Sequence, residues 1–263
     1  MKTHLWGAIC ASALAFATAT LEAAPVSGQG TWETTLLPRD LTGDGVADAY
    51  YDTVLDITWL ADANLAATEA FGTAGINAGT MAWDTANTWI ANMNAVSYLG
   101  YSDWRLPTLS PINGSAFDDN FAYDGRTDSG YNITAPGSAH PGSTASEMAH
   151  LFYNTLGNTG WYDTSGNTTG CTAPDYCLTN TGPFANIQPS NYWSGLEYAS
   201  NTNRAWDFGF YDGNQLTYLK SFTRYAWAVR PGDVSAVPLP AAVWLFGTGL
   251  MGLFGAGVRR RTR

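Results

Sequence analysis

Residues 100–108, Gly-Tyr-Ser-Asp-Trp-Arg-Leu-Pro-Thr, constrain the fold more than any other part of the chain. Pro107 fixes its own φ and lacks an N–H, so a helix must end before it or begin after it. Trp104 and Leu106 are apolar residues among polar neighbours, and Arg105 lies between them in a chain with few cations. The pattern predicts a turn that holds a buried Trp and a partly buried Arg at the end of one element.

The first 24 residues are typical of a secretory signal peptide. Lys2 and His4 precede an apolar run from Leu5 to Phe16, and small residues follow the run. This order of charged, apolar and small residues is the pattern of a secretory signal peptide, with the small residues at the cleavage site. We therefore expect residues 1–24 to be removed and the mature chain to be exported.

The last 30 residues, 234–263, have a different pattern. Pro238 and Pro240 precede the uncharged stretch 241–257, which is at the short limit for a transmembrane helix. A basic cluster follows that stretch and predicts a cytoplasmic C-terminus; it contains Arg259, Arg260 and Arg261.

This tail resembles the PEP-CTERM sorting signal of Gram-negative bacteria that produce exopolysaccharide, with Leu239 where the usual motif has Glu. The resemblance implies that the chain is anchored transiently in the inner membrane. It also implies that an exosortase then cuts the chain and releases it to the cell envelope, the outer surface or the extracellular matrix.

The region between the two signals, residues 25–233, is long enough for one domain with its own core. The whole chain has 12 Lys and Arg against 22 Asp and Glu, and five of these cations but only one acid lie in the two ends, so this region carries a formal charge of −14. Nucleic acid is an unsuitable partner for such a surface. Divalent cations are attracted by it.

Oxygen-bearing side chains recur early in this region; they are Asp40, Thr42, Asp44, Asp48 and Asp52. The first four fit a calcium-loop count with Gly45 at its sixth position. Tyr51 stands where an EF-hand has its bidentate acid. Two readings remain open, a looser calcium site and a β-hairpin whose Asp-Gly turn supplies the positive φ.

Several secondary-structure elements have clear sequence signals. Alternation over residues 52–60 predicts a strand, and the spacing of apolar residues predicts a helix over 81–93 with Thr80 as its N-cap. Residues 144–147, Thr-Ala-Ser-Glu, read as a capping box that begins a second helix ending before Gly157.

The remaining segments are loops and short strands. Residues 25–38 read as an extended lead-in, and residues 109–143 read as a long surface loop. Short strands are expected around 192–195, 206–210 and 225–229, with a hairpin turn at Asp212-Gly213. The aromatic residues that alternate in these strands favour a core.

The mature chain has two cysteines, Cys171 and Cys177. In an oxidising compartment a disulfide that closes a small loop is expected. The histidines left after export are His140 and His150, so a Ser-His-Asp catalytic set cannot be argued, and we expect a protein that is not an enzyme.

Four motifs occur in an order that resembles the Lcl C-terminal-like domain family; they are Trp104–Thr108, Ser146–Leu151, Tyr192–Ser194 and Ala226–Arg230. The resemblance covers about residues 50–231. It implies an α+β fold of the C-type-lectin-like and formylglycine-generating-enzyme-like kind, with two helices, small twisted antiparallel sheets, long loops and adjacent termini. The framework residues it implies are Trp104, Arg105, Pro107, Trp193, Trp227 and Arg230, the two arginines being ion-pair or hydrogen-bond partners.

A non-enzymatic binding domain is the function that these features favour. The expected ligand is a neutral or cationic extracellular polysaccharide, because the acidic core would repel the sulfated glycans linked to the family's namesake. We expect residues 109–143 and 196–215 to form the binding surface. The alternatives are a calcium-stabilised structural surface protein and a formylglycine-generating-like oxidoreductase that uses Cys171 and Cys177.

Overall fold

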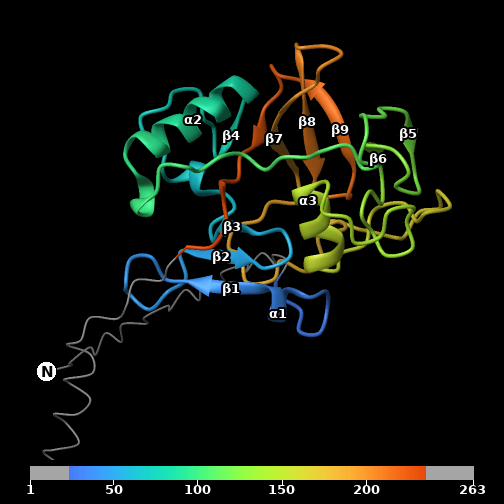
Figure 1. Cartoon of the computed structure of the whole chain (residues 1–263), viewed down its shortest axis with the longest axis horizontal. Coiled ribbons are helices and arrows are strands. Elements are labelled where there is room, and N and C mark those ends of the chain that lie inside the picture. The colour runs from blue at the N-terminus through green and yellow to red at the C-terminus, as the bar shows by residue number, and fades with distance from the viewer. Residues whose placement is uncertain (1–23, 235–263) are drawn as a thin grey trace, which may run out of the picture.

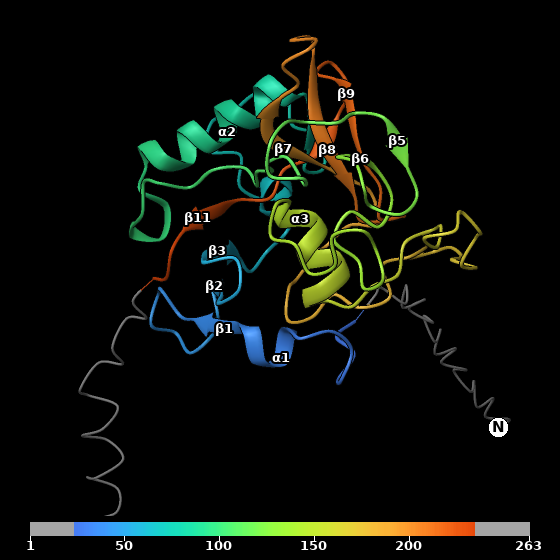
Figure 2. The same ribbon diagram turned by 45° about the vertical axis from the view of Figure 1, so that its right-hand side comes forward.

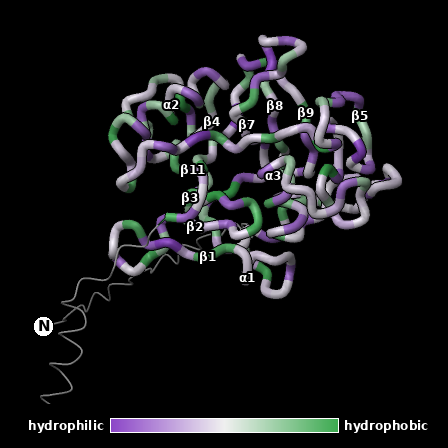
Figure 3. The backbone as a smooth tube through the Cα atoms, in the orientation of Figure 1, coloured by the Kyte–Doolittle hydropathy of each residue, from purple (hydrophilic) through white to green (hydrophobic). Residues whose placement is uncertain are grey.

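The computed structural model describes residues 24–234, so the predicted signal peptide and sorting signal lie outside the described residues except for residues 24 and 234. The chain has a mixed α+β fold with two sheets and few helices (Figure 1). Apolar residues form short stretches scattered along the tube rather than long runs (Figure 3). The core is therefore assembled from many elements.

The first sheet has the strand order β1-β2-β3-β11, and all its pairs are antiparallel. Its strands are β1 (Leu36–Arg39), β2 (Ala49–Asp52), β3 (Ile57–Leu60) and β11 (Val229–Pro231). β1 follows a one-turn helix, α1 (Trp32–Thr35), where the sequence predicts an extended lead-in. The first and last strands of the described chain, β1 and β11, form the two opposite edges of this sheet.

The second sheet has the strand order β4-β10-β7-β8-β9-β6-β5. Its strands are β4 (Thr80–Met81), β5 (Phe121–Ala122), β6 (Ser129–Gly130), β7 (Asn191–Glu197), β8 (Arg204–Gly209), β9 (Gln215–Leu219) and β10 (Arg224–Tyr225). The β7–β8–β9 meander is antiparallel, whereas β10 with β7 and β5 with β6 are short parallel contacts. The prediction of small antiparallel sheets is thus confirmed for most pairs.

The remaining helices are α2 (Trp83–Ala95), α3 (Glu147–His150), the π-helical turn η3 (Leu151–Thr155) and the 3₁₀ turns η1 (Leu65–Ala67) and η2 (Tyr98–Gly100).

Buried aromatic side chains pack between the two sheets. Trp59 of the first sheet lies 4.8 Å from Trp227, and Trp227 lies 5.9 Å from Phe210 beyond β8, measured between ring centroids. All three rings are buried.

The strand predicted over residues 52–60 is wrong, because a turn divides it into β2 and β3. The Asp52 carboxylate accepts hydrogen bonds from the N–H groups of Val54 and Leu55, and Asp56 has a positive φ of 50°. Side-chain capping of this kind competes with a continued strand.

The predicted helix caps also need correction. Thr80 and Met81 belong to β4, which pairs with β10, so the helix begins later with Ala82 as its N-cap. In the second helix the Ser146 hydroxyl is the cap and accepts from Ala149 N–H. Glu147 does not close a capping box, because its carboxylate binds Arg105 instead.

The segment 109–143 is only partly a surface loop. It contains β5 and β6, and its residues 127–135 are buried. The Asp128 carboxylate accepts from the N–H groups of Ile112 and Asp118, which folds the segment onto itself. The Gly, Pro, Asn, Asp and Ser residues of this segment therefore indicate an irregular backbone, not exposure to solvent.

Candidate functional site

The turn between β8 and β9, residues 210–213, holds two neighbouring segments by backbone hydrogen bonds. The Trp161 N–H donates to the Asp212 carbonyl at 2.7 Å, and the Cys177 N–H donates to the Tyr211 carbonyl at 2.9 Å. Segments about 35 to 50 positions away in sequence are therefore fixed to one turn. The aromatic side chains of these segments lie close to one another beside the turn.

A glycine in this turn permits a third segment to approach. Gly213 has φ of +79°, and a Cβ there would lie 2.5 Å from the Tyr153 hydroxyl. That hydroxyl donates to the Gly213 carbonyl at 2.6 Å and accepts from the Asn132 N–H at 3.0 Å. The residues next to Tyr131 are thereby tied to the turn through η3.

The disulfide between Cys171 and Cys177 closes a small loop beside the turn, as the sequence predicts. Within it, the Tyr176 N–H donates to the Thr172 carbonyl, and Tyr176 has a positive φ of 53°. Residue Tyr176 is 39% exposed. The covalent loop therefore presents one aromatic side chain to solvent at a defined place.

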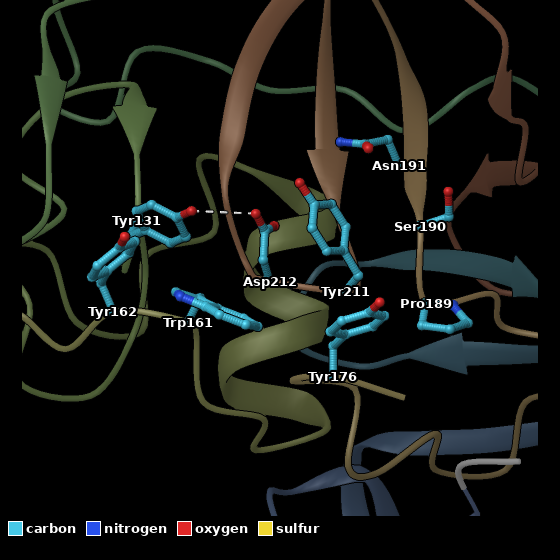
Figure 4. Close-up of a pocket in the computed structure, with 9 residues that line it drawn as sticks. All are labelled: Tyr131, Trp161, Tyr162, Tyr176, Pro189, Ser190, Asn191, Tyr211 and Asp212. Carbon is cyan, nitrogen blue, oxygen red and sulfur yellow. Dashed lines mark hydrogen bonds between the residues drawn. The ribbon is translucent and has the colours of Figure 1, made fainter. Parts of the chain in front are cut away.

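These segments line an open pocket of about 480 Å³, within the usual volume range for small-molecule sites (Figure 4). Its lining residues are Tyr131, Trp161, Tyr162, Tyr176, Pro189, Ser190, Asn191, Tyr211 and Asp212. In Figure 4 the Asp212 carboxylate points between the Tyr131 and Tyr211 rings, with the Trp161 indole below it. Five of the nine lining residues are aromatic.

The aromatic rings form two contacting groups around the carboxylate. The Tyr131 and Tyr162 centroids are 5.0 Å apart, and the Tyr176 ring lies 6.3 Å from that of Trp161 and 6.2 Å from that of Tyr211. Such rings offer flat apolar faces, and their hydroxyl and indole N–H groups offer polar tips. The arrangement suits a ligand that has both C–H faces and polar substituents.

Asp212 is the charged residue of the pocket. Its carboxylate accepts from the Tyr131 hydroxyl at 3.2 Å and from the Asn214 N–H at 3.0 Å. Burial raises its pKa to about 6, so the carboxylate is ionised at neutral pH. The pKa of Tyr131 is raised by its burial and by the Asp212 charge, which keeps the phenol protonated as a donor.

The predicted framework residues lie away from this pocket. Arg105 makes a bidentate ion pair with Glu147, at 2.6 and 2.8 Å, and Glu147 also accepts from the Thr108 N–H. Arg230 makes a bidentate pair with Asp103, at 2.8 Å for both bonds, and its guanidinium lies 4.2 Å from the Tyr101 ring centroid. Both arginines join the segment 100–108 to other elements.

The framework tryptophans are buried and donate to backbone carbonyls. The indole N–H groups of Trp104, Trp193 and Trp227 bind the carbonyls of Tyr98, Met81 and Leu60 respectively. The Pro107 carbonyl accepts from the Gly195 N–H, which joins the segment 100–108 to β7. These residues stabilise the core, and none of them lines the pocket.

Four of the five residues considered for calcium, together with Gly45, lie in the turn between β1 and β2 (the acidic turn, residues 40–48). The Asp40 carboxylate accepts from the N–H groups of Gly43 and Gly45, and the Asp48 carboxylate accepts from Leu41 and Thr42. The segment is thus a β-hairpin connection, one of the two readings of the sequence. Calcium binding there stays a prediction.

Asp52 does not belong to the acidic turn. It is the last residue of β2 and pairs with Leu36, whereas Asp48 precedes the first residue of that strand. Its buried carboxylate caps the following turn, and burial raises its pKa. The five-residue set is therefore not assembled. Among the described residues, no group of three His, Cys, Asp or Glu side chains is placed to hold a metal ion.

Of the two segments expected to form the binding surface, 109–143 supplies Tyr131, and 196–215 supplies Tyr211 and Asp212. Sequence reasoning missed Trp161, Tyr162 and Tyr176. The available signal was a group of aromatic residues on both sides of the first cysteine of a small disulfide loop. Such a loop can display rings only if tertiary contacts orient it.

The two processing hypotheses concern residues outside 24–234, whereas the oxidoreductase hypothesis concerns Cys171 and Cys177. The predicted membrane helix 241–257 lies outside the described residues, and between residues 24 and 234 no helix combines the length and apolar character needed to cross a bilayer. Cys171 and Cys177 are bonded to each other, whereas the copper thiolate site of a formylglycine-generating-like oxidoreductase needs both cysteines as thiolates.

Comparisons with family models, curated proteins and solved structures found no match to this chain.

Proposed function

We propose that this chain is an exported, exosortase-sorted protein of the cell envelope or extracellular matrix, whose domain binds glycan without acting as an enzyme. The observation that carries the proposal is the aromatic pocket around Asp212. Aromatic faces stack on the C–H faces of sugar rings, and the neighbouring hydroxyl and amide groups accept or donate to sugar hydroxyls.

The chemistry of the surroundings restricts the glycan class. The domain has a formal charge of −14, and the pocket contains a carboxylate and no cation among its lining residues. Sulfated or uronic polysaccharides would be repelled. A neutral or cationic extracellular polysaccharide is the ligand that this charge distribution favours.

The proposal includes the C-type-lectin-like fold and the place of action. Two sheets, few helices, and first and last strands that share one sheet support a fold of that kind. In this proposal the signal peptide exports the chain, and the tail 241–257 anchors it in the inner membrane of a Gram-negative bacterium. An exosortase then recognises the sorting signal that contains Pro238 and Pro240 and cuts the chain. The domain then associates with exopolysaccharide.

The experiment is a calorimetric titration of the full chain, held in mild detergent, with exopolysaccharide fragments purified from the producing bacterium. We expect binding, and we expect Trp161→Ala to weaken it about tenfold or more, as loss of about 1.4 kcal/mol of stacking would do. Phe222→Ala is the matched control, since Phe222 is an exposed aromatic residue outside the pocket. No binding by the wild-type chain, or an equal effect of the two variants, would contradict the proposal.

A further inference from the structure

The Asp212 side chain is a buried anion for which the described residues supply no cation. Residue Asp212 is 4% exposed. The ion pairs found within residues 24–234 join Arg39 to Asp233, Arg105 to Glu147, Arg126 to Asp124, Lys220 to Glu197, Arg224 to Asp207, and Arg230 to Asp103. The groups that donate to the Asp212 carboxylate are all neutral: the hydroxyls of Tyr131 and Tyr211 and the Asn214 N–H. Buried charges in proteins are normally paired with an opposite charge.

The groups that surround this carboxylate also favour a cation. The titratable groups that face it are the phenols of Tyr131 and Tyr211 in the pocket and of Tyr153 on η3, with Asp207 farther along β8. Asp207 is already paired with Arg224. Aromatic faces are negative at their centres and attract ammonium groups, an attraction that grows when the site is desolvated.

Resting on the proposed function, we propose that the pocket selects an ammonium group, so that the ligand is an amino-sugar polysaccharide with free amines. The ammonium group lies against the Asp212 carboxylate, and the Trp161, Tyr176 and Tyr211 rings surround it. The sugar ring that bears it stacks on one of these aromatic faces. A fully N-acetylated chain fits the same pocket by stacking but gains no charge pairing.

The experiment compares three tetramers of equal length on the full chain in mild detergent at pH 7.5: N-acetylglucosamine, glucosamine, and N-trimethylated glucosamine. The trimethylated tetramer is cationic at every pH, whereas the unmodified amine titrates. We expect the trimethylated tetramer to bind about tenfold or more tighter than the acetylated one, which corresponds to about 1.4 kcal/mol. Added salt reduces the difference.

Two variants separate the Asp212 carboxylate from the overall charge. Asp212→Asn should make the two tetramers bind alike, while its affinity for the acetylated tetramer shows that the pocket remains folded. Asp44→Asn removes the same charge from the acidic turn, which lies at the opposite end of the domain from the disulfide loop in both ribbon views (Figures 1 and 2). That variant should keep the preference.

A pH titration of the wild-type chain tests the inference without any substitution. Affinity for the trimethylated tetramer should fall as the pH drops through about 6, where Asp212 becomes protonated. Equal binding of cationic and acetylated tetramers at pH 7.5 would overturn this inference and leave the proposed function standing. Failure of all three tetramers and of the exopolysaccharide would overturn both.

Discussion

The acidic turn and the aromatic pocket both contain aspartates, but they place the carboxylates in opposite environments. In the acidic turn, backbone N–H groups, that of Gly45 above all, lower the pKa of the partly exposed Asp40. In the pocket, burial raises the pKa of Asp212 to about 6. The same functional group is therefore stabilised as an anion at one end of the domain and destabilised at the other.

The difference comes from burial by segments distant in sequence, because Asp212, like Asp40, also has a local backbone donor, the Asn214 N–H. The donors to Asp40 lie three and five residues along the chain, so the turn solvates its own charge. One hydroxyl that donates to Asp212 belongs to Tyr131, 81 positions away. A carboxylate that already accepts hydrogen bonds from nearby backbone N–H groups gains little from binding a ligand. A carboxylate buried by distant segments carries a desolvation cost, which a cationic ligand can offset.

The largest expected effect comes from removing the covalent support of the pocket. In the double variant Cys171→Ser with Cys177→Ser, a small closed loop is lost, and we expect the free energy of unfolding to fall by about 2–3 kcal/mol. Glycan affinity should fall with it, because Tyr176 lies in that loop. Chemical denaturation and calorimetry measure the two quantities.

Amide hydrogen exchange provides the internal control for that variant. The amides of Leu41 and Thr42, which donate to Asp48 in the acidic turn, should keep their protection. A loss of protection there equal to the loss around Tyr176 would show that the two regions do not behave independently.

An intermediate effect is expected from Asp212→Asn on the pH dependence of stability. Because the folded-state pKa of Asp212 is raised above its unfolded value, the folded state binds the proton more tightly, and stability falls as the pH rises from about 4 to 6. The variant should lack that loss and exceed the wild type at pH 8 by about 1–2 kcal/mol. Below pH 4, where Asp212 is protonated in both the folded and the unfolded state, the Asp212 charge should not contribute to any difference in stability between the variant and the wild type. A wild-type advantage at pH 8 would contradict this account of the buried charge.

The smallest expected effect concerns the acidic turn. If free calcium at about five times its dissociation constant occupies this turn, the free energy of unfolding rises by about 1 kcal/mol relative to chelator. Thermal melts of the full chain with calcium and with chelator measure the rise. Asp44→Ala should abolish it, and Asp52→Asn should leave it, because Asp52 lies at the far end of β2. An unchanged wild-type melt would make the turn an ordinary hairpin connection.

Local patterns predicted much of the backbone. The helix expected over 81–93 is α2 at Trp83–Ala95, displaced because Thr80 and Met81 pair with β10. The hairpin turn at Asp212-Gly213 and the disulfide occur where the sequence predicts them. The strand over 52–60 was wrong because the Asp52 carboxylate caps a turn, which an alternating pattern cannot reveal.

The candidate site was predicted less completely than the backbone. The sequence indicated two of its segments, those with Tyr131 and Tyr211, but gave no register that would bring them together. The part played by Glu147 was also hidden, because its spacing from Thr144 fits a capping box equally well. Arg105, 42 positions away, binds it instead.

The sequence by itself determined the features that depend on neighbours within a few residues: the helix periodicity, the Asp-Gly turns, the closing of the small disulfide loop, and the acidic composition. The tertiary structure decided which polar groups become partners and which become buried without a cation. The physical reason is that hydrogen bonds and ion pairs act over about 3 Å in space, whereas desolvation depends on everything packed around a group. Asp212 and its ring of aromatic side chains exist only after distant segments have met.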